Sequence, residues 1–194
     1  KFVFFYGAGC SSELANKIIE YPFTQFFKNA EININHDLEA ACYAMYDNKP
    51  NITCILGTGS NSCYYDGNEL IEKVPALGYV LGDEGSGSYF GKKLLTDYLY
   101  NKLPFEIKDD LECHFNISKA IIFENVYMRP NANVYLASFM KFITNHKENN
   151  YVSKMVENGM DQFMKTHVCC YDNYKEVKSH FIGSISALYE NELR

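Results

Sequence analysis

The chain has 194 residues, of which 47% are hydrophobic and 15% aromatic, so it carries enough apolar surface for one large core or two modest ones. A net charge of −6 without long single-sign runs argues against a nucleic-acid partner, and no apolar stretch approaches the ~20 residues that a membrane-spanning helix needs. We therefore expect a globular, cytoplasmic protein with neither a nucleic-acid nor a membrane partner.

The cysteines argue against disulfides and metal cages. There are seven of them, an odd number with no C-x-x-C spacing, and most lie inside apolar runs. The five histidines do not pair with them at metal-ligand spacing. We expect reduced thiols and no metal cage built from protein thiols.

The first 45 residues alternate between strand and helix patterns. Residues 2–6 form a short aromatic and β-branched run that stops at a glycine turn, and a second such run covers 32–35. A helix over about 12–28, capped by Ser11 or Ser12, lies between them, and Asp37 is placed to cap the next helix. This order predicts a parallel βαβ unit.

A different pattern begins after the breaker at 48–51. Three strands are predicted over 52–56, 62–65 and 69–74, with Asp66-Gly67 as a type I′ hairpin signal, so a second sheet starts here. The remaining chain reads as helices at about 85–101, 109–115, 118–127, 132–146 and 150–170, then a strand over 179–182 and a terminal helix.

The first candidate site is the turn that follows the strand 52–56. It contains two glycines and three small polar residues, which leaves backbone N–H groups and hydroxyls free to approach phosphate oxygens. It is not a Walker loop, because G-x-x-x-x-G-K-[ST] is absent, and an ordinary hairpin turn explains it equally well. Its members are Gly57, Thr58, Gly59, Ser60 and Asn61.

The second candidate is the glycine-dense acidic stretch 78–88. Asp83 and Glu84 stand among four glycines, where carboxylates could accept hydrogen bonds from sugar hydroxyls with few side chains in the way. The alternative is structural: Asp83 caps the following helix and Glu84 interacts with its dipole.

Two further candidates lie at strand ends and in a helix. Asp37 follows a parallel strand, where open α/β sheets bind ligands, and could act as a base toward a hydroxyl, while His36 reads as its hydrogen-bonded neighbour. Gly159 within a helix and Gly183-Ser184 after a strand could leave space for an adenine ring. Close helix packing explains Gly159 at least as well.

Read together and in this order, these motifs resemble the N-acetylglucosamine kinase branch of the BadF/BadG/BcrA/BcrD ATPase family, in the actin-like ATPase and sugar kinase superfamily. The resemblance spans essentially the whole chain, and the pair Gly-Thr-Gly-Ser-Asn and Gly-Asp-Glu-Gly-Ser is its most specific part. The matching segments are 5–10, 36–41, 54–62, 82–87 and 181–184.

The resemblance implies an α/β protein of ribonuclease H-like domains, each a mixed sheet flanked by helices, which close over ATP and a sugar. It implies that Asp37 is the base, that the turn around Thr58 binds phosphate, and that Gly159, Gly183 and Ser184 line the adenosine pocket. Sugar contacts are implied for Ser60, Asn61, Asp83, Glu84 and the positions of Leu77 and Gly78. Leu77 departs from the family, which has a tryptophan there, and this puts the identity of the sugar in doubt.

A second departure concerns the ends of the chain. The family begins with an Asp-x-Gly-x-Thr-Lys phosphate loop and ends with a strand and helix that we do not find, so we expect residues 1–50 to be part of the first domain. Residues 51–194 would form the second domain, with a helical insertion at about 102–148. Mg²⁺ would be held mainly by residues outside this chain, and the fragment alone would be inactive.

Three functions are open at this point. The first is an ATP- and Mg²⁺-dependent kinase acting on the 6-hydroxyl of an amino sugar, above all N-acetylglucosamine. The second is a nucleotide-dependent activator or regulator that shares the fold without phosphorylating a sugar, and the third is a sugar-sensing module without catalysis. The sequence also leaves open whether the protein forms a homodimer.

Overall fold

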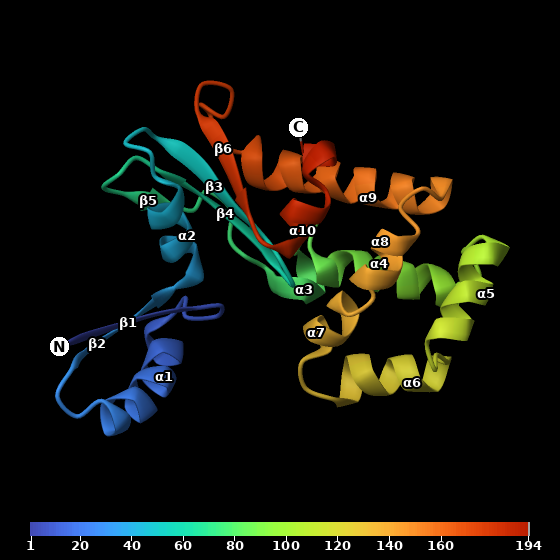
Figure 1. Ribbon diagram of the computed structural model, residues 1–194, viewed down its shortest axis with the longest axis horizontal. Coiled ribbons are helices and arrows are strands. Elements are labelled where there is room, and N and C mark those ends of the chain that lie inside the picture. The colour runs from blue at the N-terminus through green and yellow to red at the C-terminus, as the bar shows by residue number, and fades with distance from the viewer. Residues whose placement is uncertain (194) are drawn as a thin grey trace.

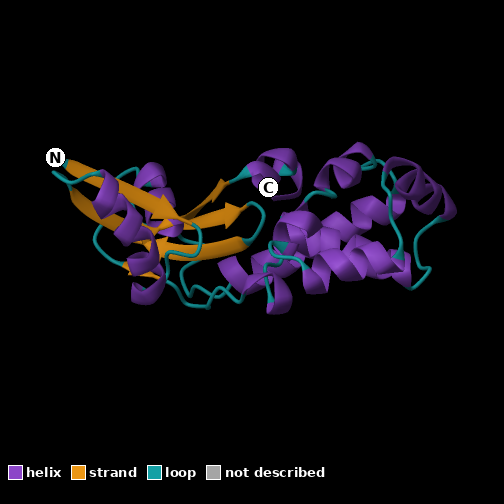
Figure 2. Cartoon of the chain, turned by 90° about the horizontal axis from the view of Figure 1, so that it is seen from below, coloured by secondary structure: helices purple, strands orange, loops and turns teal. Residues whose placement is uncertain are grey.

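The computed structural model describes residues 1–193. It shows an elongated molecule in which the strands gather at one end and most helices at the other (Figure 1, Figure 2). The chain is a mixed α/β protein with two separate sheets, a two-stranded one and a four-stranded one.

The predicted βαβ unit is confirmed at the start of the chain. It consists of β1 (Phe2–Gly7), α1 (Glu13–Phe26), β2 (Glu31–His36) and α2 (Asp37–Met45). The strands β1 and β2 are parallel, with Phe2 opposite Glu31 and Gly7 opposite His36. Ser12 caps α1, since its hydroxyl accepts from the Ala15 N–H at 3.2 Å.

The prediction that Asp37 caps α2 is wrong. His36 occupies the N-cap position in extended conformation, without a side-chain capping bond, and Asp37 is the first residue of the helix. The Asp37 carboxylate is thus not used to close the helix end, although its negative charge suits the positive end of the helix dipole.

The second sheet contains β3 (Asn51–Leu56), β4 (Ser60–Tyr65), β5 (Leu70–Ile71) and β6 (Lys178–Ile182), in the order β5-β4-β3-β6. The strand β3 is antiparallel to β4 and parallel to β6, and β5 is antiparallel to β4. The new sheet is confirmed, although its predicted third strand, 69–74, is reduced to two residues.

The hairpin between β4 and β5 does not have the predicted type I′ geometry. That turn needs positive φ at both central residues, and Gly67 has φ +101° whereas Asp66 does not lie in the positive range. The Asp66 carboxylate instead accepts from the N–H groups of Asn68 and Glu69, at 2.8 and 2.7 Å. An Asx-type turn over four residues replaces the tight two-residue turn.

The helices follow the predicted order with different boundaries. The π turns η1 (Glu124–Met128) and η2 (Met164–Val168) continue α6 (Lys119–Phe123) and α9 (Asn150–Phe163), and the short helix α3 (Gly78–Leu81) was not expected. The predicted helix 132–146 is broken, because Ser138 ends its first part and its hydroxyl bonds back to the Tyr135 carbonyl. The elements are α3 (Gly78–Leu81), α4 (Gly87–Leu99), α5 (Phe105–His114), α6 (Lys119–Phe123), η1 (Glu124–Met128), α7 (Ala132–Ala137), α8 (Met140–Asn145), α9 (Asn150–Phe163), η2 (Met164–Val168), α10 (Ser184–Leu188) and the 3₁₀ turn η3 (Glu190–Leu193).

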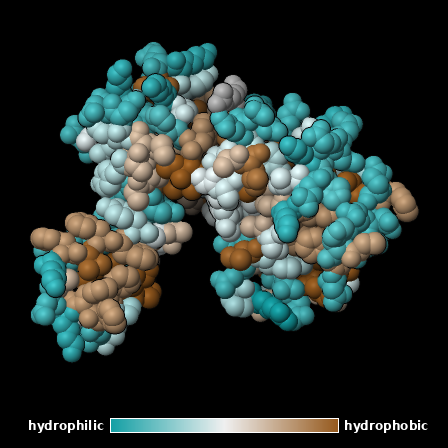
Figure 3. Space-filling view, in the orientation of Figure 1, coloured by the Kyte–Doolittle hydropathy of each residue, from teal (hydrophilic) through white to brown (hydrophobic). Residues whose placement is uncertain are grey.

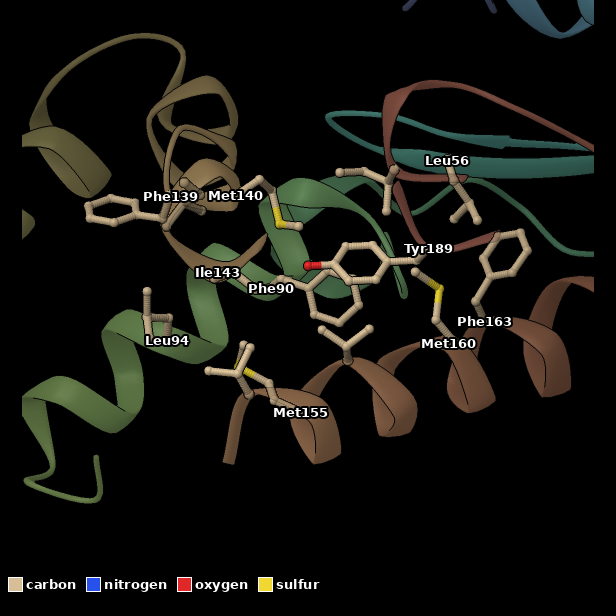
Figure 4. Packing of buried hydrophobic residues seen from close by; sticks show 14 of the residues in the cluster. Leu56, Phe90, Leu94, Phe139, Met140, Ile143, Met155, Met160, Phe163 and Tyr189 are labelled. Carbon is tan, nitrogen blue, oxygen red and sulfur yellow. The ribbon is translucent and has the colours of Figure 1, made fainter. Parts of the chain in front are cut away.

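Successive side chains along β3 and β4 point to opposite faces of the sheet, so each face packs into its own hydrophobic core. The larger core lies between the sheet and α4, α9 and α10. In Figure 4 the rings of Phe90 and Tyr189 lie next to each other, with their centroids 6.4 Å apart and their planes tilted by 49°. The smaller core joins α2 to the other face of the sheet through Leu38, Cys42, Cys63 and Tyr65. The Cys42 and Cys63 sulfurs are 2.8 Å apart there.

The predicted division into domains at residue 50 and the insertion at about 102–148 stay predictions. The helices α5 and α6 lie at the end of the molecule farthest from β1 and β2 (Figure 1). Within residues 1–193, no helix combines the length and the hydropathy needed to cross a bilayer.

Candidate functional site

The turn between β3 and β4 sits directly on the start of α4. The Gly87 N–H donates to the Gly57 carbonyl at 2.8 Å, and the Ser88 N–H donates to the Thr58 carbonyl at 3.0 Å. The turn closes on itself through the Gly57 N–H and the Gly59 carbonyl, at 2.9 Å. The two glycine-rich stretches, which the sequence singled out separately, therefore form one structural unit.

Asp83 joins these two stretches and is not a helix cap, which corrects the structural alternative for this residue. Ser86 caps α4 instead, accepting from the Tyr89 N–H at 3.2 Å. The Asp83 carboxylate accepts from the Ser60 N–H at 3.3 Å and from the Ser88 hydroxyl at 3.4 Å. Gly59 is required beside it, since a Cβ there would lie 2.9 Å from Asp83 Oδ2.

Asp83 is unusual for a carboxylate in its burial, its pKa and its backbone conformation. The side chain is 8% exposed, and burial raises its pKa, although the hydrogen bonds from Ser60 and Ser88 act in the opposite direction. Its backbone has φ +61°, a left-handed conformation that only Gly, Asn and Asp adopt readily. A left-handed backbone at a residue other than glycine and a shifted carboxylate pKa are both frequent at ligand sites.

The tip of the β3–β4 turn has unused hydrogen-bond donors. Within the described residues, the N–H groups of Thr58 and Gly59 and the Thr58 hydroxyl have no protein acceptor, and Thr58 is exposed. Consecutive free N–H groups in a glycine turn can bind an anion. This arrangement fits the phosphate-binding role predicted for Gly57, Thr58 and Gly59.

Parallel pairing brings Gly183 and Ser184 to the same place. Ile182 ends β6 opposite Ile55 of β3, so the turn after β6 lies beside the turn after β3. Gly183 has φ +119°, and a side chain there would collide with the Leu56 carbonyl. Ser184, the next residue, is exposed at the start of α10.

Gly159 lies deeper than these residues. It is buried in α9, and a side chain would collide with the ring of Phe90. Its carbonyl also lies close to Gly85, at 3.4 Å from where a Cβ would stand. This is the close packing that the sequence offered as an alternative, so an adenosine contact for Gly159 stays a prediction.

Asp37 is the first residue of α2 and directly follows the carboxyl end of β2. Figure 3 shows a hollow between the lobe of β1, β2 and α1 and the helical lobe. The Oδ1 atom of Asp37 lies 3.2 Å from His36 Nε2, as expected for neighbours. Asn35, His36 and Glu72 line a cavity of about 280 Å³. Glu72 connects this cavity to the turn, because its Oε2 accepts from Asn61 Nδ2 at 3.2 Å.

Leu77 and Gly78 form the start of α3, at the entrance of the second glycine stretch. Leu77 is 54% exposed, and its Cβ would lie 3.0 Å from a Cβ at Gly82. Gly78 adopts φ +69° and accepts the Gly82 N–H at 2.8 Å. The exposed aliphatic side chain of Leu77 thus stands where the family that the sequence resembles has a tryptophan.

Two residues of this region were not predicted from the sequence. Glu72 orients the Asn61 amide, and His167 of η2 lies with Nε2 at 3.4 Å from Glu84 Oε2. His167 is 3% exposed, and burial lowers its pKa, which keeps the imidazole neutral. The available signal was a histidine four residues after Phe163, on the apolar face of a predicted helix.

Metal-ligating side chains do not gather in the part of the chain that the structure describes. Residues 1–193 contain no group of three or more His, Cys, Asp and Glu side chains that could hold a metal ion.

The whole chain resembles solved kinase structures. A putative N-acetylglucosamine kinase from Porphyromonas gingivalis is 34% identical, with a TM-score of 0.91, over 99% of this chain and 68% of that chain. A putative N-acetylglucosamine kinase from Chromobacterium violaceum shares the fold at 16% identity and a TM-score of 0.68, over 89% of this chain and 62% of that chain. No protein-family model matches the chain, and no curated protein sequence matches it.

Proposed function

This chain belongs to the N-acetylglucosamine kinase-like family of the Porphyromonas gingivalis protein, and from that premise we propose that it serves an ATP-dependent sugar kinase. The acceptor is the 6-hydroxyl of an amino sugar, above all N-acetylglucosamine. The assignment to the BadF/BadG/BcrA/BcrD group is part of the same proposal.

The observation that carries the proposal is the docking of the β3–β4 turn on α4 through Asp83. It places the free N–H groups of Thr58 and Gly59 beside the buried Asp83 carboxylate in space, and two to three residues from the Asn61 amide along the chain. Phosphate needs the former, and sugar hydroxyls need the latter. Ser60 contributes through both its N–H and its hydroxyl, which bond Asp83 and the Glu84 carbonyl and so hold the loop in place.

In this proposal Asp37 is the catalytic base. Its carboxylate follows the carboxyl end of β2, in the position where open α/β sheets bind ligands. It accepts the proton of the sugar 6-hydroxyl as that oxygen bonds to the γ-phosphorus of ATP, and the bond to the β-phosphate oxygen breaks to release ADP.

ATP and Mg²⁺ are the cofactors of the proposal. Gly57, Thr58 and Gly59 would hold phosphate, and Gly183, Ser184 and Gly159 would lie along the adenosine. When bound, Mg²⁺ would neutralise charge on the phosphates.

The test is the replacement Asp37→Asn in the full-length protein, with N-acetylglucosamine as substrate. We expect kcat to fall by about 10²–10⁴-fold because the base is lost. Sugar binding, measured by calorimetry, should stay within a few-fold of wild type. Asp47→Asn is the matched control, since Asp47 lies just beyond α2 and contacts Lys178 instead.

Near-wild-type turnover by the Asp37→Asn protein would refute the assignment of the base. A wild-type protein that releases ADP at the same rate with and without any amino sugar would instead favour the nucleotide-dependent activator. A protein that binds sugar without turnover would favour the sensing module.

A further inference from the structure

We infer that His167 is a positioning residue of the sugar site, holding the Glu84 carboxylate in place. The inference rests on the proposed function, because Glu84 is one of the proposed sugar contacts. His167 comes from η2, more than 80 residues further along the chain, and nothing in the motif pattern assigns it a role.

Both the ring and the backbone carbonyl of His167 contact other residues of this region. Its Nε2 lies 3.4 Å from Glu84 Oε2, and its carbonyl accepts the Ser62 hydroxyl at 2.6 Å. The ring stacks on Phe163 with centroids 5.0 Å apart and an interplanar angle of 21°. One residue therefore connects the acidic loop to β4, directly beside Asn61.

The π turn puts the histidine in this place. The helix α9 widens to π geometry over Met164–Val168, and such single turns recur at functional sites because they reorient one side chain. The carbonyl of His167 meets Ser62 rather than a later helical N–H, since Tyr171 donates to Val168 instead. The same turn thus anchors the sheet and aims the imidazole.

The tautomer follows from the surroundings. His167 Nδ1 is buried without a hydrogen-bond partner, whereas Nε2 faces Glu84. An N–H at Nδ1 would be an unpaired buried donor, so the proton belongs on Nε2, where it can be donated to the carboxylate. The charged groups near the ring are Glu84 and, more distantly, Asp83. A neutral donor orients Glu84 while leaving its negative charge available to sugar hydroxyls.

The test compares His167→Phe with His167→Gln in the full-length protein. Phenylalanine keeps the stacking on Phe163 but removes the donor, and the KM for N-acetylglucosamine should rise about tenfold or more while the KM for ATP stays unchanged. The amide nitrogen of glutamine reaches the position of Nε2, so His167→Gln should restore KM to within a few-fold. Adding His167→Phe to the Glu84→Ala protein should not raise the KM for N-acetylglucosamine any further, because His167 acts through Glu84.

His146→Phe is the matched control. His146 forms a similar pair, with Nε2 at 2.8 Å from Asp110 Oδ2, in the helices away from the site, and its loss should leave both KM values unchanged. Equal effects of His167→Phe and His167→Gln, or effects of His167→Phe and Glu84→Ala that multiply, would overturn the inference.

The failure of the proposed function would be visible separately. If wild type binds N-acetylglucosamine without turnover, the kinase proposal fails. The role of His167 is then decided by calorimetric sugar binding of His167→Phe, His167→Gln, Glu84→Ala and the double variant. If wild type neither binds nor phosphorylates amino sugars, both ideas are overturned.

Discussion

At the scale of single residues, Asp83 shows how a site residue departs from ordinary structural roles. It occupies a left-handed conformation, it is buried, and it accepts hydrogen bonds from Ser60 and Ser88. A helix N-cap accepts a backbone N–H of its own helix, whereas the partners of Asp83 lie in β4 and in the side chain of Ser88. In our proposal, this combination keeps the carboxylate in place for a sugar while it also joins the two glycine-rich stretches.

Replacing Asp83 should separate stability from sugar affinity. Asn tolerates the left-handed conformation and keeps an acceptor, so Asp83→Asn should unfold in urea at nearly the wild-type concentration. Asp83→Ala should lose about 1–2 kcal/mol from backbone strain, and more from the lost acceptor. Both variants should bind N-acetylglucosamine more weakly. Equal stability of the two variants would contradict the strained conformation.

His167 predicts a pH dependence of stability. Because burial lowers its pKa, the unfolded chain takes up a proton near pH 6.5 that the folded chain refuses, so the free energy of unfolding should fall as pH drops from about 7.5 to 5.5. His167→Phe should flatten this part of the curve, measured by urea unfolding at several pH values. The raised pKa of Asp83 has the opposite effect, since the folded chain binds its proton more readily and the free energy of unfolding increases as pH falls toward 3.8, below the range in which His167 titrates. An unchanged slope in the His167→Phe protein would show that other groups cause it.

At the scale of elements, the start of α4 supports both halves of the site. Its first turn donates to the β3–β4 turn, and Ser86 closes the helix end while contacting the Ser88 hydroxyl at 3.1 Å. Any movement of this helix end would move Thr58 and Asp83 together.

Ser86→Ala should therefore affect stability and substrate binding at once. Loss of the cap should cost about 1 kcal/mol of unfolding free energy, and the KM values for sugar and ATP should both rise. Ser118→Ala is the control, because Ser118 caps α6 in the same way, accepting from the Ile121 N–H at 3.3 Å, at the far end of the molecule. It should lower stability without changing either KM. Unchanged KM values in Ser86→Ala would separate α4 from the site.

At the scale of the whole molecule, the two lobes differ in how much apolar surface they bury. The lobe of β1, β2 and α1 exposes the large side chains Phe2, Phe4, Leu14, Ile18 and Phe26. The second sheet and its helices enclose a continuous core (Figure 4). Local opening should be easier in the first lobe, since few buried contacts resist it.

Hydrogen exchange on the 194-residue chain tests this difference. We expect amides of β1 and β2 to exchange at least about tenfold faster than those of β3 and α9, because regions with few buried contacts open more readily. Mass spectrometry of peptides from the two regions would measure it. Equal protection would mean that the lobes unfold as one unit.

The residue patterns alone were sufficient for much of the local structure. A serine cap at Ser11 or Ser12, the parallel pair β1 and β2, and the start of a new sheet near residue 51 all follow from signals within a few residues of each other, and the structure shows Ser12 to be the cap. The glycine content of the turns around Thr58 and Asp83 likewise predicts candidate binding sites, whereas the hydrogen bonds that join the two turns do not follow from local patterns.

Tertiary structure alone decided which distant residues meet. The parallel register of β3 and β6 brings Gly183 onto Leu56, and the π turn aims His167 at Glu84. Local signals reflect the dihedral preferences and periodicity of neighbouring residues, whereas these meetings depend on sheet register and on the packing of helices around a shared core. The neighbours of Asp83 in sequence are therefore compatible with a helix cap, whereas its actual partners, the Ser60 N–H and the Ser88 hydroxyl, are set by the tertiary structure.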